Sequence, residues 1–163
     1  MNEYTFFVDS SCDTPATYLE AWGVKCIDLT FRFVDSQDEY KNSQIDVKEF
    51  YQNLRDGRDA KTSAVNVEEF KLAFEPELAA GRDVFYLGFS SGLSTTFNSS
   101  RLAARELSEK YPDRKVIVAD SLCASTGYGM LTYLTVKKLE EVATLEEAAE
   151  YVEQTRPNIC HWF

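Results

Sequence analysis

Short apolar runs alternate along the chain with segments whose apolar residues recur at helical spacing. The runs at Tyr4–Val8, Asp83–Phe89 and Lys115–Ala119 predict strands, because each is short, apolar or β-prone, and followed by small polar residues. After the second run, apolar and small residues recur every three or four positions, which predicts a helix with one buried face. That face comprises Ser100, Ala103, Ala104, Leu107 and Tyr111.

Cap residues and helix breakers predict five further helices. Capping boxes, in which two side chains bond each other's backbone N–H groups, mark helix starts at Asn66 and Thr144. Pro76 should bend or interrupt the helix that Asn66 begins, because proline lacks the backbone N–H that a helix interior uses. The predicted helices run from a Thr14 cap and Pro15 to Gly23, from Asp46 to Gly57, from Asn66 to Gly81, from Ala124 to Val142, and from Thr144 to about Arg156.

Four segments lack a helical pattern. Val24–Val34 predicts a single strand, whose alternating apolar and polar residues indicate one solvent-exposed face. Residues 35–44 are polar and predict a loop or a hairpin return through Tyr40. Lys61–Val65 has no periodicity and predicts a connector, whereas Ile159–Phe163 predicts the start of another strand.

The order of strands and helices predicts an α/β fold, a parallel sheet between two helical layers in a three-layer αβα arrangement. In open α/β sheets, ligands bind outside the carboxyl ends of the strands. Three predicted strands end there in hydroxyl or carboxylate residues, which is better evidence for a site than any one of them, although Asp and Ser are also ordinary turn residues. These residues include Asp9, Ser10, Ser91, Asp120, Ser121 and, at the following helix, Ser125.

The loop from Ser90 to Thr96 contains only Ser, Thr, Gly and Leu, and it leads from a buried strand to a helix. The first N–H groups of a helix lack partners inside it, and the helix dipole places partial positive charge there. Serine and threonine hydroxyls add further donors. The loop therefore predicts a site for an anion such as a carboxylate or phosphate. The alternative is that it only caps the helix of a ligand-free structural or interaction domain.

An enzyme is a second alternative, because residues 88–92 match the pattern G-x-S-x-G of serine hydrolases. Ser90, Asp120 and His161 also follow the chain order of that triad. Against it, the helix starts too late after Ser90, and no H-G-G-G segment supplies an oxyanion hole. His161 lies in an apolar run near the chain end, where a structural role is expected.

Composition narrows the classes of function. The 163 residues suffice for one domain, and 17 basic against 27 acidic residues give a net charge of −10. This negative charge disfavours binding to nucleic acid and to anionic membranes. No apolar run is long enough for stable membrane insertion.

Four widely spaced cysteines and one histidine make a metal site unexpected, and no dinucleotide or phosphate-loop motif indicates a cofactor. The N-terminus lacks a signal-peptide pattern. A cytoplasmic protein with reduced thiols is the simplest interpretation.

Four segments together resemble the DegV family of bacterial fatty-acid-binding proteins. Residues 9–15 (DSSCDTP) are similar to D-S-x-x-D-L-P, and residues 62–66 (TSAVN) keep the Thr-Ser of T-S-Q-P-S. Residues 90–100 (SSGLSTTFNSS) are similar to S-S-x-L-S-G-T-Y-Q-S-A, with Thr95 in place of glycine. Residues 120–129 match D-S-x-x-x-S-x-G-x-G.

The resemblance implies a protein of two α/β domains that holds a long-chain fatty acid between them. It carries the acid to a separate fatty-acid kinase and performs no chemistry itself. The carboxylate would meet the hydroxyls of Thr62 and Ser94 together with backbone amides, so that Thr62, Ser63, Ser94 and Thr95 form the expected site. Asp9, Ser10, Ser91, Asp120, Ser121 and Ser125 would form its rim.

Two departures from the family pattern affect these expectations. Thr95 adds a Cβ atom where the backbone approaches the ligand closely. The chain also stops before the family's second domain, so residues 1–163 are expected to be the N-terminal domain alone. An apolar face would then be exposed, self-association could cover it, and fatty acids should bind weakly or not at all.

Overall fold

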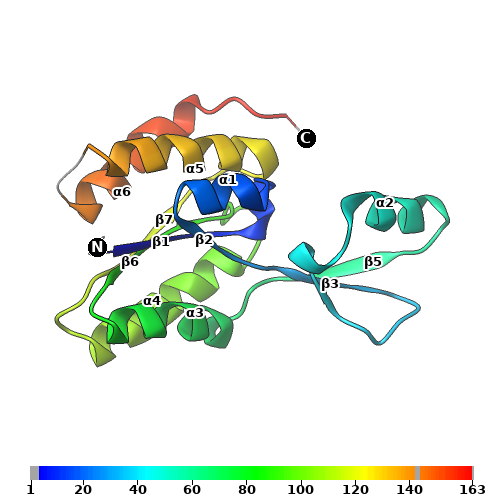
Figure 1. Ribbon diagram of the computed structural model, residues 1–163, viewed down its shortest axis with the longest axis horizontal. Helices are drawn as coiled ribbons and strands as arrows, with labels where there is room; N and C mark the ends of the chain where they lie inside the picture. Colours follow the sequence, from blue (N-terminus) through cyan, green and yellow to red (C-terminus); the bar gives the residue numbers. More distant parts are fainter. Residues whose placement is uncertain (1–3, 142–143, 163) are drawn as a thin grey trace.

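The main sheet has four parallel strands, and the computed structural model describes it within residues 4–141 and 144–162. The strand order is β2-β1-β6-β7. Helices α1, α5 and α6 cover one face, and α3 and α4 cover the other (Figure 1). The predicted three-layer α/β fold is confirmed. The bounds are β1 Tyr4–Asp9, β2 Val24–Ile27, β6 Asp83–Gly88, β7 Val116–Asp120, α1 Ala16–Ala21, α3 Val67–Ala79, α4 Thr96–Lys110, α5 Ser125–Leu139 and α6 Leu145–Thr155.

Two apolar cores lie on the two faces of this sheet. Alternate residues of β6 enter opposite cores, because successive side chains of a strand point to opposite faces. Phe85 and Leu87 join the core beneath α5 and α6, whereas Val84 and Tyr86 join the core beneath α3 and α4. With both faces covered, β6 can be apolar throughout, which explains why the sequence shows a continuous run.

A second sheet corrects two predictions. Val24–Val34 is not one strand, because the chain leaves the parallel sheet after β2 and enters β3 (Thr30–Phe33) of a three-stranded antiparallel sheet. The predicted connector at Lys61–Val65 was also wrong, since Ala60–Ser63 forms β5 and pairs with β3. The hairpin return through Tyr40 is confirmed, because Tyr40 in β4 (Tyr40–Lys41) pairs with Phe31.

An aromatic cluster holds the small sheet to α2 (Val47–Arg55). Phe31 lies 4.9 Å from Phe50 of α2 and 5.5 Å from Tyr40, measured between ring centroids. On Phe33, the guanidinium of Arg58 lies 3.9 Å from the ring centroid. Figure 1 shows this unit beyond the edge at which the parallel strands end.

Both predicted capping boxes are present, at Asn66 and Thr144. Pro76, however, neither interrupts α3 nor ends it. The carbonyl deprived of a partner belongs to Leu72, one turn earlier on the same face. The Leu72 side chain is 76% exposed, so water can reach this side of the helix.

Three other predicted boundaries differ. Thr14 does not cap α1, because its hydroxyl donates to the carbonyl of Cys12, and Pro15 takes the cap position. α5 ends at Leu139, and the predicted end at Val142 lies outside the described residues. Residues 159–162 form no strand; His161 instead packs against Gly127 of α5, where an added Cβ would lie 2.7 Å from the histidine.

Candidate functional site

Asp9 organises the carboxyl edge of the parallel sheet. It ends β1, and its residue surface is 0% exposed. One carboxylate oxygen accepts hydrogen bonds from the Tyr86 hydroxyl at 2.6 Å and from the Phe89 backbone N–H at 2.9 Å, while the other accepts from the Ser11 N–H at 3.0 Å. The Tyr128 hydroxyl of α5 accepts from the Asp9 N–H at 3.0 Å. This one side chain therefore connects the turn after β1 to the loop after β6.

Burial raises the pKa of Asp9, although the hydrogen bonds from Tyr86, Phe89 and Ser11 oppose that effect. Burial also raises the pKa of Tyr86 well above its usual range, so its hydroxyl stays a donor. With its oxygens occupied and no exposed surface, Asp9 holds the edge together from inside and does not face a ligand directly.

The hydroxyl-rich loop after β6 is held at its start by backbone N–H groups and at its end by the Ser94 side chain. The Ser90 N–H donates to the Cys123 carbonyl at 3.1 Å, and the Ser91 N–H donates to a carboxylate oxygen of Asp120 at 3.2 Å. The Ser94 hydroxyl lies 2.9 Å from that of Thr96 and accepts from the Thr96 N–H at 3.2 Å. Thr95 occupies the N-cap position of α4 without a side-chain cap bond. Ser94 and Thr95 thus lie at a helix N-terminus, as predicted.

The loop after β7 forms the adjoining wall. Asp120 accepts a second N–H bond, from Leu122, at 3.0 Å. The Ser121 hydroxyl is buried and donates to the Cys123 carbonyl at 3.2 Å. Leu122 and Ser125 have positive φ angles of 51° and 48°, which is costly for residues other than glycine. The hydrogen bonds of this loop therefore hold Leu122 and Ser125 in backbone conformations that these residues would not favour on their own.

Thr62 and Ser63 lie on the other sheet. Both are exposed, and their backbones pair with Phe31 and Thr30 of β3. Ser10 connects that sheet to the parallel sheet, because its hydroxyl oxygen accepts from the Leu29 N–H at 2.9 Å and from the Asn42 side chain at 3.0 Å.

The predicted residues are therefore distributed over two connected units. Asp9, Ser10, Ser91, Ser94, Thr95, Asp120, Ser121 and Ser125 belong to the parallel-sheet edge, and Thr62 and Ser63 to the small sheet. Sequence reasoning did not single out Tyr86 and Tyr128 as residues of this edge. Their position in apolar runs gave no sign that their hydroxyls meet Asp9.

The geometry around the G-x-S-x-G match is structural. Ser90 is buried, and its hydroxyl oxygen accepts from the Gly92 N–H at 3.3 Å. One oxygen of the Asp120 carboxylate accepts both N–H bonds above, and His161 packs against Gly127 of α5. α4 begins only at Thr96, which agrees with the delayed helix start that the sequence predicted.

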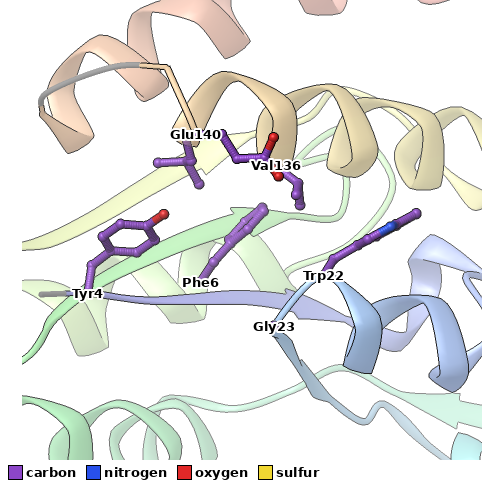
Figure 2. Close-up of a pocket in the computed structure, with 7 residues that line it drawn as sticks. Tyr4, Phe6, Trp22, Gly23, Val136 and Glu140 are labelled. Atoms are coloured by element: carbon purple, nitrogen blue, oxygen red, sulfur yellow. The ribbon is translucent and has the colours of Figure 1, made fainter. Parts of the chain in front are cut away.

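A small cavity lies elsewhere on the molecule, at the amino ends of β1 and β2. Figure 2 shows Tyr4, Phe6, Trp22, Val136 and Glu140 around it. Its volume is about 150 Å³. Pockets that enclose small organic ligands measure roughly 300–1,000 Å³, so this cavity is too small to hold a long acyl chain.

The described ranges hold neither a candidate metal cluster nor a membrane-spanning helix. In residues 4–141 and 144–162, no cluster of three or more His, Cys, Asp or Glu side chains could hold a metal ion. In the same ranges, no helix has both the length and the apolar character needed to cross a membrane.

Comparisons with known proteins place this arrangement in a family. The sequence model described as "Uncharacterised protein, DegV family" matches residues 5–163. A DegV domain-containing protein of Clostridium perfringens is 34% identical over 165 aligned positions, which cover 100% of this chain and 56% of that protein. A Thermotoga maritima protein named fatty acid-binding protein is 31% identical over 154 positions, covering 93% of this chain and 52% of that one.

A solved structure agrees with these sequence relatives. The crystal structure of a stearic acid-binding protein from Eubacterium ventriosum matches with a TM-score of 0.83 at 28% identity, covering 92% of this chain and 52% of that one. This chain thus spans about half the length of the relatives it matches, and those with functional names are described as binding proteins. From the family match over nearly its whole length and the shared fold, we conclude that the chain belongs to the DegV family.

Proposed function

We propose that this chain is the carboxylate-binding part of a fatty-acid carrier. The observation that carries the proposal is the hydroxyl-rich loop after β6, held at the N-terminus of α4 with Ser94 and Thr95 at its end. Relatives named for fatty-acid or stearic-acid binding support the choice of ligand. Thr62 and Ser94 would donate hydrogen bonds to the carboxylate, with Ser63 and Thr95 beside them.

The chemistry of this loop suits a charged acceptor. The hydroxyls of Ser94 and Thr96 now bond each other; the half-buried Ser94 hydroxyl can rotate to donate outward instead, whereas Thr96 is buried and supports it from inside. The N-terminal N–H groups and dipole of α4 favour negative charge at the same place. Each hydrogen bond to a charged group contributes about 1.5–3 kcal/mol.

Most of the affinity for a long-chain acid must come from its methylene groups, at roughly 0.8 kcal/mol for each one buried. The relatives are nearly twice as long as this chain, and we propose that their additional residues bury part of the acyl chain. The 163-residue chain would then recognise the headgroup but bind fatty acids more weakly than those relatives.

The wider role follows from family resemblance. The chain would present the fatty-acid carboxylate to a separate fatty-acid kinase in the cytoplasm and would perform no reaction itself. A reconstituted assay with such a kinase, ATP and oleate tests this step. Acyl phosphate formation should depend on the carrier, and equal formation without it would contradict the role.

An NMR titration tests headgroup recognition even if binding is weak. Adding decanoate to delipidated, ¹⁵N-labelled protein should shift the amide signals of residues 62–63 and 94–97, while decanol should shift them much less. Ser94→Ala and Thr62→Ala should each reduce these shifts. Ser108→Ala is the matched control, because Ser108 is exposed near the C-terminal end of α4, away from the edge. Equal shifts with decanol, or decanoate shifts confined to other residues, would overturn the proposal.

A further inference from the structure

The edge strand β2 brings Cys26 to the same face of the sheet as Cys12. In the register of the parallel pair, Cys26 lies opposite Val8, which belongs to the core beneath α5 and α6. Val24, two residues before Cys26, joins that same core, so the alternation of the strand points Cys26 toward it. Cys12 is also a member of this core, because the short helical turn after β1 folds back over the sheet.

Both thiols are in the free, reduced form, and each shifts the pKa of the other. The interaction with Cys26 lowers the pKa of Cys12, whereas that with Cys12 raises the pKa of Cys26. The Cys26 thiol itself donates only a weak hydrogen bond, to the Ile27 carbonyl 3.9 Å away. Cys12 is 1% exposed and Cys26 is exposed, so the pair reaches from the core to the surface at the edge of the sheet.

We propose that Cys12 and Cys26 are a redox modification site that forms a reversible disulfide when the protein meets hydrogen peroxide. No cysteine takes part in the proposed carboxylate site, so this inference is independent of the ligand. It rests on the strand register and on the face of the sheet that Cys26 shares with Cys12, and the effect of each thiol on the pKa of the other agrees with this placement.

The reaction balances without a further reagent. One thiolate attacks a peroxide oxygen and breaks the O–O bond, which yields a sulfenic acid and a hydroxide that takes up the released thiol proton. The second thiolate attacks the sulfenic sulfur, an S–S bond forms, and the departing hydroxide takes up the second proton. Two thiols and one peroxide thus give one disulfide and two water molecules, the sulfurs being oxidised and the peroxide reduced.

The bond would fasten the turn after β1 to the edge strand β2. That turn contains Ser10, which links the small sheet through Leu29 and Asn42. Oxidation would therefore stiffen the junction between the two sheets. Because the disulfide closes the loop of residues 12–26, we expect the melting temperature to rise by roughly 5 °C or more.

Peptide mapping tests the proposal directly, because Lys25 separates the two cysteines. The full chain is treated with a small excess of peroxide, its free thiols are blocked, and it is digested with trypsin without reductant. We expect residues 1–25 and 26–32 to appear as one linked species, lighter by two hydrogen atoms than the sum of the peptides, and to separate with dithiothreitol. Hydrogen exchange should slow at residues 24–29 in the oxidised form.

Two variants complete the test. Cys26→Ser, at an exposed position, should remove the linked species and the rise in melting temperature. Cys160→Ser removes the other exposed cysteine and should leave both unchanged. The proposal is overturned if peroxide yields only sulfinic or sulfonic acids, if Cys12 links to Cys123 or Cys160 instead, or if exchange at residues 24–29 is the same in both forms.

Discussion

The two sheets of this protein differ in how many of their faces are buried. In the parallel sheet, five of the six residues of β1 and of β6 are buried, because helices cover both faces. In the antiparallel sheet, β3 alternates between buried Phe31 and Phe33 and exposed Arg32. An apolar run and an alternating run both predict strands. The continuous run indicates a strand whose two faces are both covered, whereas the alternating run indicates one covered and one solvent-exposed face.

The sheets also differ in what stabilises them. The parallel sheet shares two cores with five helices. The small sheet depends on one aromatic cluster against α2, on Arg58 over Phe33, and on its link through Ser10. We expect the parallel sheet to set the global free energy of unfolding and the small sheet to open locally at lower cost.

Replacing one phenylalanine in each sheet should give the largest difference in free energy of unfolding between the two sheets. Phe85→Ala removes a fully buried ring that packs 5.3 Å from Phe6 and should lower the free energy of unfolding by about 3–5 kcal/mol. Phe33→Ala should lower it less and mainly speed hydrogen exchange in residues 30–63. Urea denaturation with exchange mass spectrometry measures both. Equal global losses would show that the sheets unfold as one unit.

Asp9→Asn tests the connection inside the parallel-sheet edge. An amide has one oxygen, so its NH₂ group must face either the Ser11 N–H or the donors from Tyr86 and Phe89. We expect a loss of about 2–3 kcal/mol and faster exchange at residues 89–96. Asp13→Asn, an exposed change in the same turn at a φ of 49° that asparagine tolerates, should have little effect. Similar losses in the two variants would remove the assigned role of Asp9.

Glu77→Gln tests the stability of the parallel-sheet unit through its dependence on pH. Burial raises the pKa of Glu77, but hydrogen bonds from Lys25, Thr5 and Arg82 lower it more, and hold it at about 2. An unfolded glutamate titrates near 4.3. The folded-state pKa is thus depressed, so this stabilisation is present above pH 4.5 and is lost as pH falls toward 2.

At pH 7 we expect Glu77→Gln to lower the free energy of unfolding by roughly 2–3 kcal/mol, with a smaller difference from wild type at pH 3. Glu68→Gln, which removes an exposed carboxylate paired with Lys71, should cost less than about 1 kcal/mol. Because Glu77 ties α3 to β1 and β2, the effect should appear in global unfolding. A pH-independent difference would contradict the ion-pair explanation.

Ser10→Ala should have the smallest global effect. It removes the acceptor for Leu29 and Asn42, which lowers stability by about 1 kcal/mol. Exchange at residues 29–44 should quicken while β1 and β6 stay protected. Ser108→Ala on the exposed face of α4 is the control. Unchanged exchange in the small sheet would mean that Ser10 does not hold the two units together.

Local signals predicted most of the parallel-sheet unit. The capping boxes at Asn66 and Thr144 form within four residues, so no distant contact is needed to recognise them. The hydroxyl-rich loop was found for the same reason, because its composition lies in one continuous segment. The roles of Tyr86 and Tyr128 were not predicted, since only their distance from Asp9 in space reveals them.

By itself, the order of residues determined three strands of the parallel sheet, most of the helix starts and the hydroxyl-rich edge, because burial on both faces and capping leave marks within a few positions. Only the tertiary structure decided that Val24–Val34 divides between two sheets and that Ala60–Ser63 is a strand. The exposed residues of β5 carry no apolar pattern, and they become a strand because β3, about thirty positions earlier, offers backbone hydrogen bonds.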